Sequence, residues 1–398
     1  MEIYSRININ EICKKVCSGG TPKSTHTEYY GGNIPWLNTK EVNFNRIYKT
    51  EKNITESGLE NSSAKWIEPN AVIVAMYGAT AGKTAIAKIP LTTNQACCNL
   101  MIDEEKADYR FVYYALCNDY IRLASLANGG AQQNLNAQQI KDFDIPYPDA
   151  ETQQKIANIL SSLDDKIEVN RRINEQLEEL AQALFKSWFV DFEPFKDGEF
   201  VESELVKLGD VVKTTSGGTP SRKHIEYYGG NYGWVKSKEL NGTFIVDTEE
   251  TITDEAIAKS SAKLLPEKSI LIAMYGATVG QYAILSKAMT CNQAVCALLP
   301  NDNYPYTYLF MFAKNKKDEL INKAVGSAQQ NISQILIKDL DISNDIQRIK
   351  DYHKIVSPAF EIIEKNQQEI THLTNLRDTL LPKLMSGEID VEQFNVIE

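Results

Sequence analysis

The sequence predicts a mixed α/β fold in which one domain occurs twice in tandem, and each copy is followed by a long helix. The first observation is an internal repeat: residues 18–43 match residues 216–241, and 16 of the 26 aligned positions are identical. The second is that the match continues at nearly the same offset, for example between Met76–Thr80 and Met274–Thr278. A period near 200 residues is too long for a solenoid and indicates two whole domains. We expect an approximate two-fold axis to relate them.

The third observation is a helical pattern after each copy. Residues 152–188 contain no proline or glycine, and apolar residues recur there in steps of three and four, which is a heptad seam. The seam comprises Ile156, Leu160, Leu163, Ile167, Leu177, Leu184 and Trp188. It recurs at Tyr352, Val356, Ala359, Ile363, Ile370, Leu373, Leu380 and Leu384. We expect two long helices, the first roughly 55 Å long, to pair as an antiparallel coiled coil.

Two asparagines, Asn170 and Asn366, occupy matching seam positions. Two interpretations remain open: they lie where the seam is exposed, or they fix the register of the helix pair.

These patterns divide the chain into five segments. Within each repeat we expect a buried strand (residues 71–76 and 269–274) and an amphipathic helix (residues 108–127 and 306–324). The predicted segments are a first repeat domain (1–149), a central long helix (150–193), a second repeat domain (194–343), a C-terminal long helix (344–386) and an acidic tail (387–398).

Composition favours a soluble globular protein in the cytoplasm, with 43% apolar and 24% charged residues. The net charge of −11 is concentrated in the central helix and the tail, so the nearly neutral repeats neither support nor exclude a polyanionic partner. The longest apolar run, Ala71–Met76, is too short to span a bilayer, and no leader is recognisable. Seven cysteines without a CxxC pair suit reduced thiols, and we expect no metal site.

Motifs for catalysis are weak. The segment Gly78–Thr84 resembles a phosphate-binding loop, but it has three residues between its glycines where that loop needs four, so a tight turn after a strand is favoured. Asp149 with Asp164 and Lys166 imitates a metal-dependent nuclease, yet the second repeat has no equivalent. His26 recurs as His224 without further ligands, so a surface role is expected for both.

Two further segments carry a family resemblance. Residues 184–195 read LFKSWFVDFEPF, and residues 376–389 read LRDTLLPKLMSGEI. Together with the alternation of repeat and long helix, they make the whole chain resemble the specificity subunit of a type I DNA restriction–modification system.

The resemblance implies a non-catalytic subunit that binds double-stranded DNA. Each repeat would read one half of a split site, the half-sites would lie in inverted orientation, and the helix pair would fix the gap between them. The helices would dock two methyltransferase subunits, and two restriction–translocase subunits would join the complex. S-adenosylmethionine, ATP and magnesium would belong to those partners. The alternative is a coiled-coil scaffold whose duplicated domains bind proteins.

Candidate DNA-binding residues follow from comparing the repeats. Residues that differ are suited to telling bases apart, because Asn and Gln pair with adenine and Lys and Arg with guanine. Shared residues are candidates for phosphate or groove contacts, although turn capping or core packing is an equal alternative for the threonines and tyrosines. The differing residues are Lys23, Asn38, Lys83, Arg222, Lys236 and Gln281, and the shared ones are Thr21, Lys40, Tyr77, Thr80, Thr219, Lys238, Tyr275 and Thr278. The repeated Gln132-Gln133-Asn134 motif is predicted to cap the approach to the long helix, with contact to DNA as the alternative.

Overall fold

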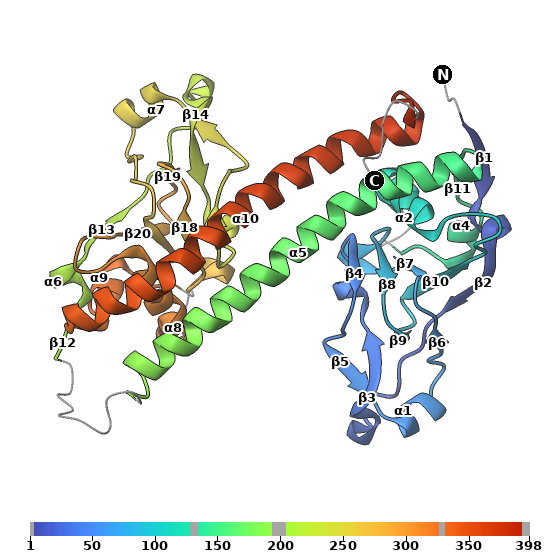
Figure 1. Ribbon diagram of the computed structural model, residues 1–398, viewed down its shortest axis with the longest axis horizontal. Helices are drawn as coiled ribbons and strands as arrows, with labels where there is room; N and C mark the ends of the chain where they lie inside the picture. Colours follow the sequence, from blue (N-terminus) through green and yellow to red (C-terminus); the bar gives the residue numbers. More distant parts are fainter. Residues whose placement is uncertain (1–3, 128–133, 193–203, 326–330, 392–398) are drawn as a thin grey trace. The chain divides into compact units, whose positions relative to one another are not determined.

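The computed structural model describes residues 4–127, 134–192, 204–325 and 331–391. Its contacts group the chain into two units, Met1–Asp165 with Thr374–Glu398, and Lys166–Leu373. Each unit holds one repeat together with parts of both long helices (Figure 1). The predicted boundaries at residues 149, 193, 343 and 386 remain a prediction, and residues 193, 194 and 392–398 lie outside the described part.

The first repeat contains a five-stranded sheet in the order β2-β10-β7-β8-β4, a four-stranded sheet in the order β5-β3-β9-β6, and the pair β1-β11. Its strands are β1 Ser5–Asn8, β2 Cys13–Ser18, β3 Tyr30–Leu37, β4 Asn45–Ile47, β5 Lys52–Ile54, β6 Trp66–Ile67, β7 Val72–Ala75, β8 Thr84–Ala87, β9 Leu91–Thr93, β10 Cys97–Ile102 and β11 Asp144–Tyr147. Its α-helices are α1 Glu56–Glu60, α2 Tyr109–Asn118, α3 Tyr120–Ser125 and α4 Ala137–Lys141.

The second repeat has the same topology, except that the counterpart of β6 is reduced to an isolated bridge between Leu265 and Met289. Its five-stranded sheet has the order β13-β20-β17-β18-β15, beside the sheet β16-β14-β19 and the pair β12-β21. Its strands are β12 Leu205–Lys207, β13 Lys213–Ser216, β14 Tyr228–Val235, β15 Phe244–Ile245, β16 Thr251–Ile252, β17 Ile270–Ala273, β18 Tyr282–Leu285, β19 Thr290–Cys291, β20 Val295–Leu299 and β21 Asp341–Ser343. Its α-helices are α6 Leu208–Val211, α7 Asp254–Lys259, α8 Tyr306–Val325 and α9 Gln334–Lys338. The duplicated mixed α/β fold is confirmed.

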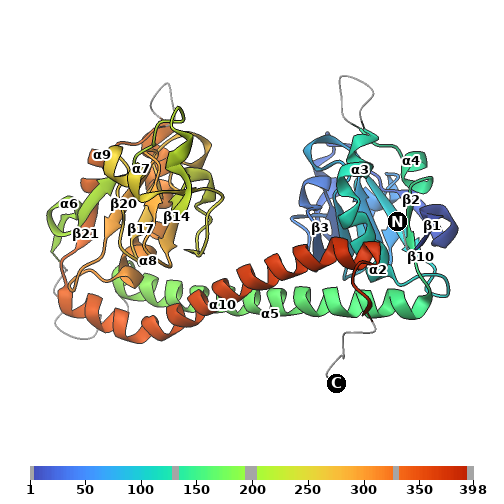
Figure 2. The same cartoon turned by 90° about the horizontal axis from the view of Figure 1, so that it is seen from above.

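The central strand of each five-stranded sheet is apolar throughout because both of its faces are covered. In β7, Val72 and Val74 belong to a core shared with α2 and the ends of the two long helices, while Ile73 and Ala75 belong to a second core on the opposite face. Figure 2 shows α2 between the sheet and those helix ends within the first unit. The strands predicted at residues 71–76 and 269–274 are confirmed.

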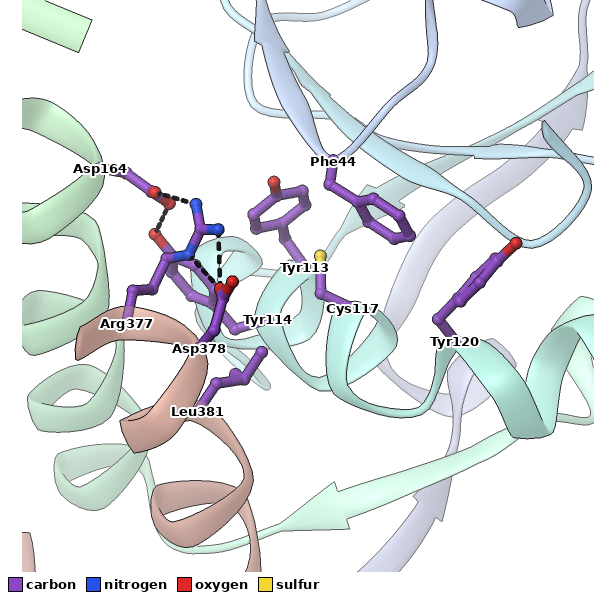
Figure 3. A pocket seen from close by; sticks show the side chains of 9 residues that line it. All are labelled: Phe44, Tyr113, Tyr114, Cys117, Tyr120, Asp164, Arg377, Asp378 and Leu381. Carbon is purple, nitrogen blue, oxygen red and sulfur yellow. Dashed lines mark hydrogen bonds and ion pairs between the residues drawn. The ribbon is translucent and has the colours of Figure 1, made fainter. Parts of the chain in front are cut away.

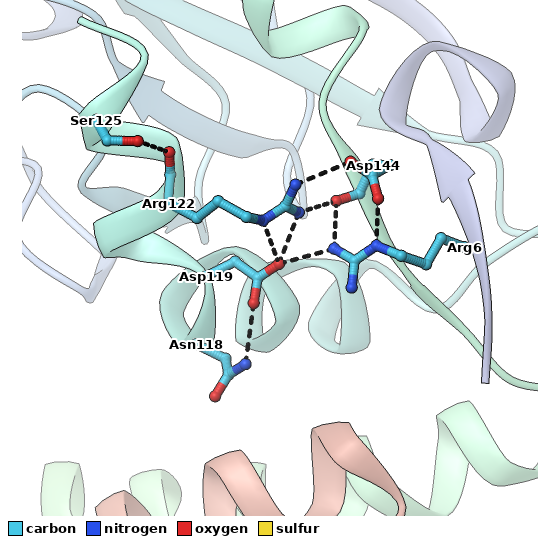
Figure 4. A network of polar contacts seen from close by, with 6 residues as sticks. All are labelled: Arg6, Asn118, Asp119, Arg122, Ser125 and Asp144. Carbon is cyan, nitrogen blue, oxygen red and sulfur yellow. Dashed lines mark hydrogen bonds and ion pairs between the residues drawn. The ribbon is translucent and has the colours of Figure 1, made fainter. Parts of the chain in front are cut away.

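The helix predicted over residues 108–127 is interrupted, whereas its counterpart α8 is continuous. At the break, the Asp119 carboxylate accepts hydrogen bonds from Arg6 at 3.0 Å and from Arg122 at 2.7 Å (Figure 4). Both arginines also bind Asp144 on β11. This network joins β1, β11 and the two helices, and a short side chain that competes for local hydrogen bonds favours a helix boundary there. The single helix predicted for this segment is therefore wrong at Asp119.

The two long helices are α5, Ala150–Phe189, and α10, Ile346–Ser386. Within the second unit they run antiparallel: the Tyr352 hydroxyl donates to the Ala181 carbonyl at 3.0 Å, while Asn170 donates to Glu369 at 2.7 Å. Later residues of α5 thus meet earlier residues of α10. In the first unit, likewise, the beginning of α5 and the end of α10 share one core with the repeat. The predicted antiparallel pair is confirmed in each unit.

The predicted seam is buried along most of its length. Ile156, Leu160, Ile167, Tyr352, Val356, Ile363, Ile370 and Leu384 are all buried. Near the end of α5 the most buried face of the helix differs from the predicted seam: Ala181 and Phe185 are buried, while the seam residues Leu184 and Trp188 are only partly buried. No helix within the described residues has both the length and the apolar composition that a bilayer span requires.

Candidate nucleic-acid interface

A glycine pair fixes the start of the candidate surface in each repeat. A Cβ atom on Gly19 would lie 2.2 Å from the Thr93 carbonyl oxygen, and one on Gly217 would lie 2.1 Å from that of Cys291. Real Cβ atoms do not approach so closely, so both positions require glycine. The loop that follows is held by a tryptophan, since Trp36 Nε1 donates to the Gly20 carbonyl at 2.9 Å. The second repeat has the same bond at 3.0 Å.

The paired threonines and histidines sit in this loop. Thr21 and Thr219 are exposed, and each hydroxyl donates to the side-chain oxygen of a glutamine, Gln95 or Gln293. The two histidines are exposed, stack on the tyrosine three residues later and bond the glutamate two residues later, so the expected surface role is confirmed. Lys23, in the same loop of the first repeat, is also exposed.

The tyrosine–threonine pair lies on a turn after the central strand. Residues Gly78–Thr80 form a 3-10 turn between β7 and β8, as the tight-turn interpretation of the glycine-rich segment predicts. Gly78 adopts φ 72°, a conformation that favours glycine. Tyr77 is 41% exposed and Tyr275 is 42% exposed, so neither is a core residue. Thr80 and Thr278 are half-buried, and the Thr278 hydroxyl bonds the Tyr275 carbonyl at 3.1 Å, as a turn residue does.

The repeated asparagine of the Gln-Gln-Asn motif pairs with this turn. Asn134 forms an isolated bridge with Tyr77, and Asn331 forms one with Tyr275. The glutamines of both copies lie outside the described residues. Asn134 lies two residues before Asn136, which caps the short helix α4, and Asp149 accepts a hydrogen bond at the start of α5, so Asn134 does not cap the long helix.

Two of the differing candidates are engaged within their own repeat. Lys83 donates to the Asn43 side chain at 2.7 Å, and Lys317 donates to Gln281 at 3.1 Å. Both Lys83 and Gln281 are half-buried, so their internal bonds compete with any contact to DNA.

The two shared lysines are exposed cations beside a glutamate. Lys40 lies 2.5 Å from Glu51, and Lys238 lies 2.6 Å from Glu249, at the equivalent position of the second repeat. The hydrogen bond that the Lys40 ammonium group donates to Glu51 raises the pKa of Lys40. A charged ammonium group at the surface can exchange such an exposed carboxylate for a phosphate, because pairs of this kind contribute little to stability.

The remaining candidates show the largest difference between the repeats. In the second repeat, Glu250 binds Arg222 at 2.7 Å and Lys236 at 2.5 Å. These bonds lower the pKa of Glu250 to about 2, with Arg222 the larger cause. In the first repeat, the position of Lys236 is held by Asn38, whose side chain caps the turn Thr39–Glu41. Glu51, Glu249 and Glu250 were not predicted from sequence, although the repeat alignment places the first two opposite each other.

The two seam asparagines make polar contacts across the helix pair in the second unit. Asn170 is 1% exposed and donates to Glu369 at 2.7 Å, while Asn366 donates to Asn174 at 2.8 Å. The two asparagines therefore do not pair with each other. Their place in the seam is as predicted, and a register role stays a prediction.

The carboxylates of the nuclease alternative are structural. Asp164 is buried, and its oxygens accept from Arg377 at 2.7 Å and from the Tyr114 hydroxyl at 2.6 Å, beside a cavity of the first unit (Figure 3). Asp149 bonds the Thr152 amide at 2.9 Å at the start of α5. Among residues 4–127, 134–192, 204–325 and 331–391, no group of three or more His, Cys, Asp or Glu side chains is placed to hold a metal ion.

Comparison with known proteins decides the family. The model of the type I restriction modification DNA specificity domain matches residues 1–179 and again residues 201–374. The chain belongs to this family, and it is a type I restriction–modification specificity subunit. The match falls once on each repeat and the helix that follows, so the duplication predicted from sequence is that of the family's domain.

Related specificity subunits agree over nearly the whole chain. The subunit is 33% identical to the type I restriction enzyme MjaIX specificity subunit of Methanocaldococcus jannaschii, over 95% of this chain and 92% of the relative. It is 26% identical to the HindI specificity subunit of Haemophilus influenzae, over 90% and 94% of the two chains. The crystal structure of a type I S subunit from M. genitalium has the same fold, with a TM-score of 0.59 at 19% identity and 96% coverage of both chains.

Proposed function

We propose that each repeat of this specificity subunit reads one half of a split duplex DNA site, and that the subunit itself catalyses no reaction. The observation that carries the proposal is that both repeats build the same loop, turn and lysine–glutamate pair beside a five-stranded sheet of the same strand order. Membership of the specificity-subunit family supports DNA as the ligand. It disfavours the alternative of a protein-binding scaffold.

The proposal includes the arrangement of the site and the partners. The half-sites lie in inverted orientation, α5 and α10 set the unread gap between them, and the helices dock two methyltransferase subunits. Two restriction–translocase subunits complete the assembly, which acts in the cytoplasm. S-adenosylmethionine, ATP and magnesium are bound by those partners, in keeping with the structural roles of Asp149 and Asp164 in this chain.

The test is co-expression with a methyltransferase subunit, followed by sequencing of methylated positions across a genome. We expect methylation at one split, asymmetric sequence with a gap of fixed length. Methylation at a single unsplit sequence contradicts the half-site assignment. A scaffold predicts no sequence-specific duplex binding even with the methyltransferase present.

The shared lysines offer a second test that does not depend on the recognised sequence. If Lys40 contacts a phosphate, K40A lowers affinity for all duplexes alike and reduces the slope of log affinity against log salt by about 0.9. K238A should do the same through the second repeat. The matched control is K259A, because Lys259 is equally exposed and paired with a glutamate but lies on α7, outside the candidate set. An unchanged slope in K40A contradicts the phosphate contact.

A further inference from the structure

The differences between the repeats gather around an invariant aromatic frame. Tyr228 and Trp234 in the second repeat correspond to Tyr30 and Trp36 in the first. The tyrosine hydroxyl donates to the carbonyl of Pro220 in one repeat and of Pro22 in the other, at 2.6 Å in both. The ring pairs also have the same separation of 6.0 Å.

The strand beside this frame has the same backbone in both repeats. Trp36 lies opposite Lys52 in the pairing of β3 with β5, and the Trp234 amide donates to the Glu250 carbonyl at 3.0 Å. A threonine two residues earlier bonds the carbonyl of Lys52 at 2.8 Å and that of Glu250 at 2.7 Å. Lys52 and Glu250 therefore occupy one and the same place, with opposite charge.

Two further positions change together with this one. In the second repeat, Glu250 binds both Arg222 and Lys236, and the Arg222 guanidinium stacks 4.2 Å from the Tyr228 ring centre. In the first repeat the same three positions hold Ser24, Asn38 and Lys52. Each set has a net charge of +1, from two cations and one anion in the second repeat and from one cation in the first. The exchange alters which hydrogen-bonding groups are presented while it preserves the attraction to phosphate.

We propose that Arg222, Lys236 and Glu250, and their counterparts Ser24, Asn38 and Lys52, are a coupled set that determines which base pairs each repeat selects. This inference rests on the proposed function and names the part of the surface that distinguishes the two half-sites. The second set presents a guanidinium and an ammonium group, which suit guanine, and the first presents an amide, which suits adenine.

The coupling follows from charge. A lysine placed at position 38 alone faces Lys52, a like charge, where the second repeat has a glutamate. Removal of Glu250 alone leaves Arg222 and Lys236 without the carboxylate that both of them bind. Single exchanges thus change the net charge of the set, whereas the threefold exchange keeps it. Only the threefold exchange is therefore expected to transfer the base preference of one repeat to the other.

The experiment uses the subunit in complex with its methyltransferase, selecting from a library of random duplexes. We expect S24R/N38K/K52E to move the preference at the first half-site toward the second, by about tenfold for at least one base pair. N38K alone should lose affinity without gaining the new preference. T27I is the matched control, because it replaces an exposed residue near the set by the isoleucine that the second repeat has at the same position, Ile225. Thr27 is outside the set, so T27I should change neither affinity nor base preference.

Three results overturn the inference. The first is a threefold variant that binds as the wild type does, with unchanged preference. The second is a threefold variant that changes only the melting temperature, as a purely structural cluster would. The third is an N38K variant that transfers the whole preference alone. If the threefold variant does not fold, R222S/K236N/E250K in the second repeat makes the reciprocal test. A wild-type complex that selects no split site contradicts the proposed function instead, so the two failures are distinguishable.

Discussion

The end of α10 is held on the first repeat by a buried ion pair whose removal should release that helix end. Asp164 is 8% exposed, and Arg377 and Tyr114 are its two hydrogen-bond donors, at 2.7 and 2.6 Å. R377A leaves a buried carboxylate with the tyrosine alone. Breaking a buried pair from one side costs about 3–5 kcal/mol, and the lower end applies because the Arg377 side chain is 24% exposed.

Removing both charges should cost less than removing one. In D164N/R377Q the amide at position 164 still accepts the Tyr114 hydroxyl, and no buried charge is left unpaired. We expect this double variant to be destabilised by about 1 kcal/mol, the net contribution of an ordinary hydrogen bond. The single and double variants therefore separate the penalty of an unpaired charge from the contribution of the contact.

Hydrogen exchange measured by mass spectrometry is the assay, because it reports opening of one helix end separately from unfolding of the chain. A loss of about 3 kcal/mol corresponds to amide exchange about 150-fold faster in residues 377–386. Amides of α8, in the other unit, should not change. The control is K383A, because Lys383 lies on the same helix end in an exposed pair with Glu388 at 3.6 Å. Exchange in R377A equal to that of the wild type, or a double variant as labile as R377A, refutes the argument.

Three further predictions concern stability. G19A should lower the free energy of unfolding of the first repeat by at least about 2 kcal/mol, because its Cβ would lie 2.2 Å from the Thr93 carbonyl oxygen. Denaturant unfolding followed by tryptophan fluorescence checks this, and an unchanged midpoint contradicts it. N366L should cost about 1 kcal/mol and N174L/N366L should recover it, because a partly buried polar group is costly only when its partner is gone. Urea unfolding followed by circular dichroism checks this, and additive losses contradict it. E250Q should be less stable than wild type at neutral pH, and the difference should vanish as pH falls from about 4.5 to about 2. The pKa of Glu250 in the folded state lies below its ordinary value, so the stability that its carboxylate contributes is lost on protonation. Melting temperatures across that range check this, and a constant difference contradicts it.

The sequence predicted those parts of the fold that occur in both copies of the duplicated domain, or that have a side-chain pattern with a regular period. The strands β7 and β17 were predictable because two copies showed the same apolar run at the same offset. The long helices were predictable because a seam of three- and four-residue steps continues over many turns. The break at Asp119 was not, because it depends on Arg6 and Arg122, and Arg6 lies 113 residues away in the sequence.

The candidate surface was predictable only in outline. The alignment identified Arg222 and Lys236 as positions that differ, since each is a charged residue aligned with an uncharged one. It gave no sign that Glu250 binds both, because that contact depends on how β14 and β16 pair and on the loop that carries Arg222. A list of differing residues therefore does not show which of them change as one set.

The contact between Asp164 and Arg377 shows why duplication alone does not predict packing. With the shift of 196 residues that aligns the two seams, Asp164 corresponds to Phe360 and Arg377 corresponds to Ala181. Both of those residues are buried in the apolar core of the second unit. Apolar packing is thus sufficient to hold a helix on a repeat, and a buried ion pair of similar volume is seldom more stable. We hypothesise that the pair selects the correct segment of α10 for packing on the first repeat, because any other helix segment docked there leaves Asp164 buried without its cation.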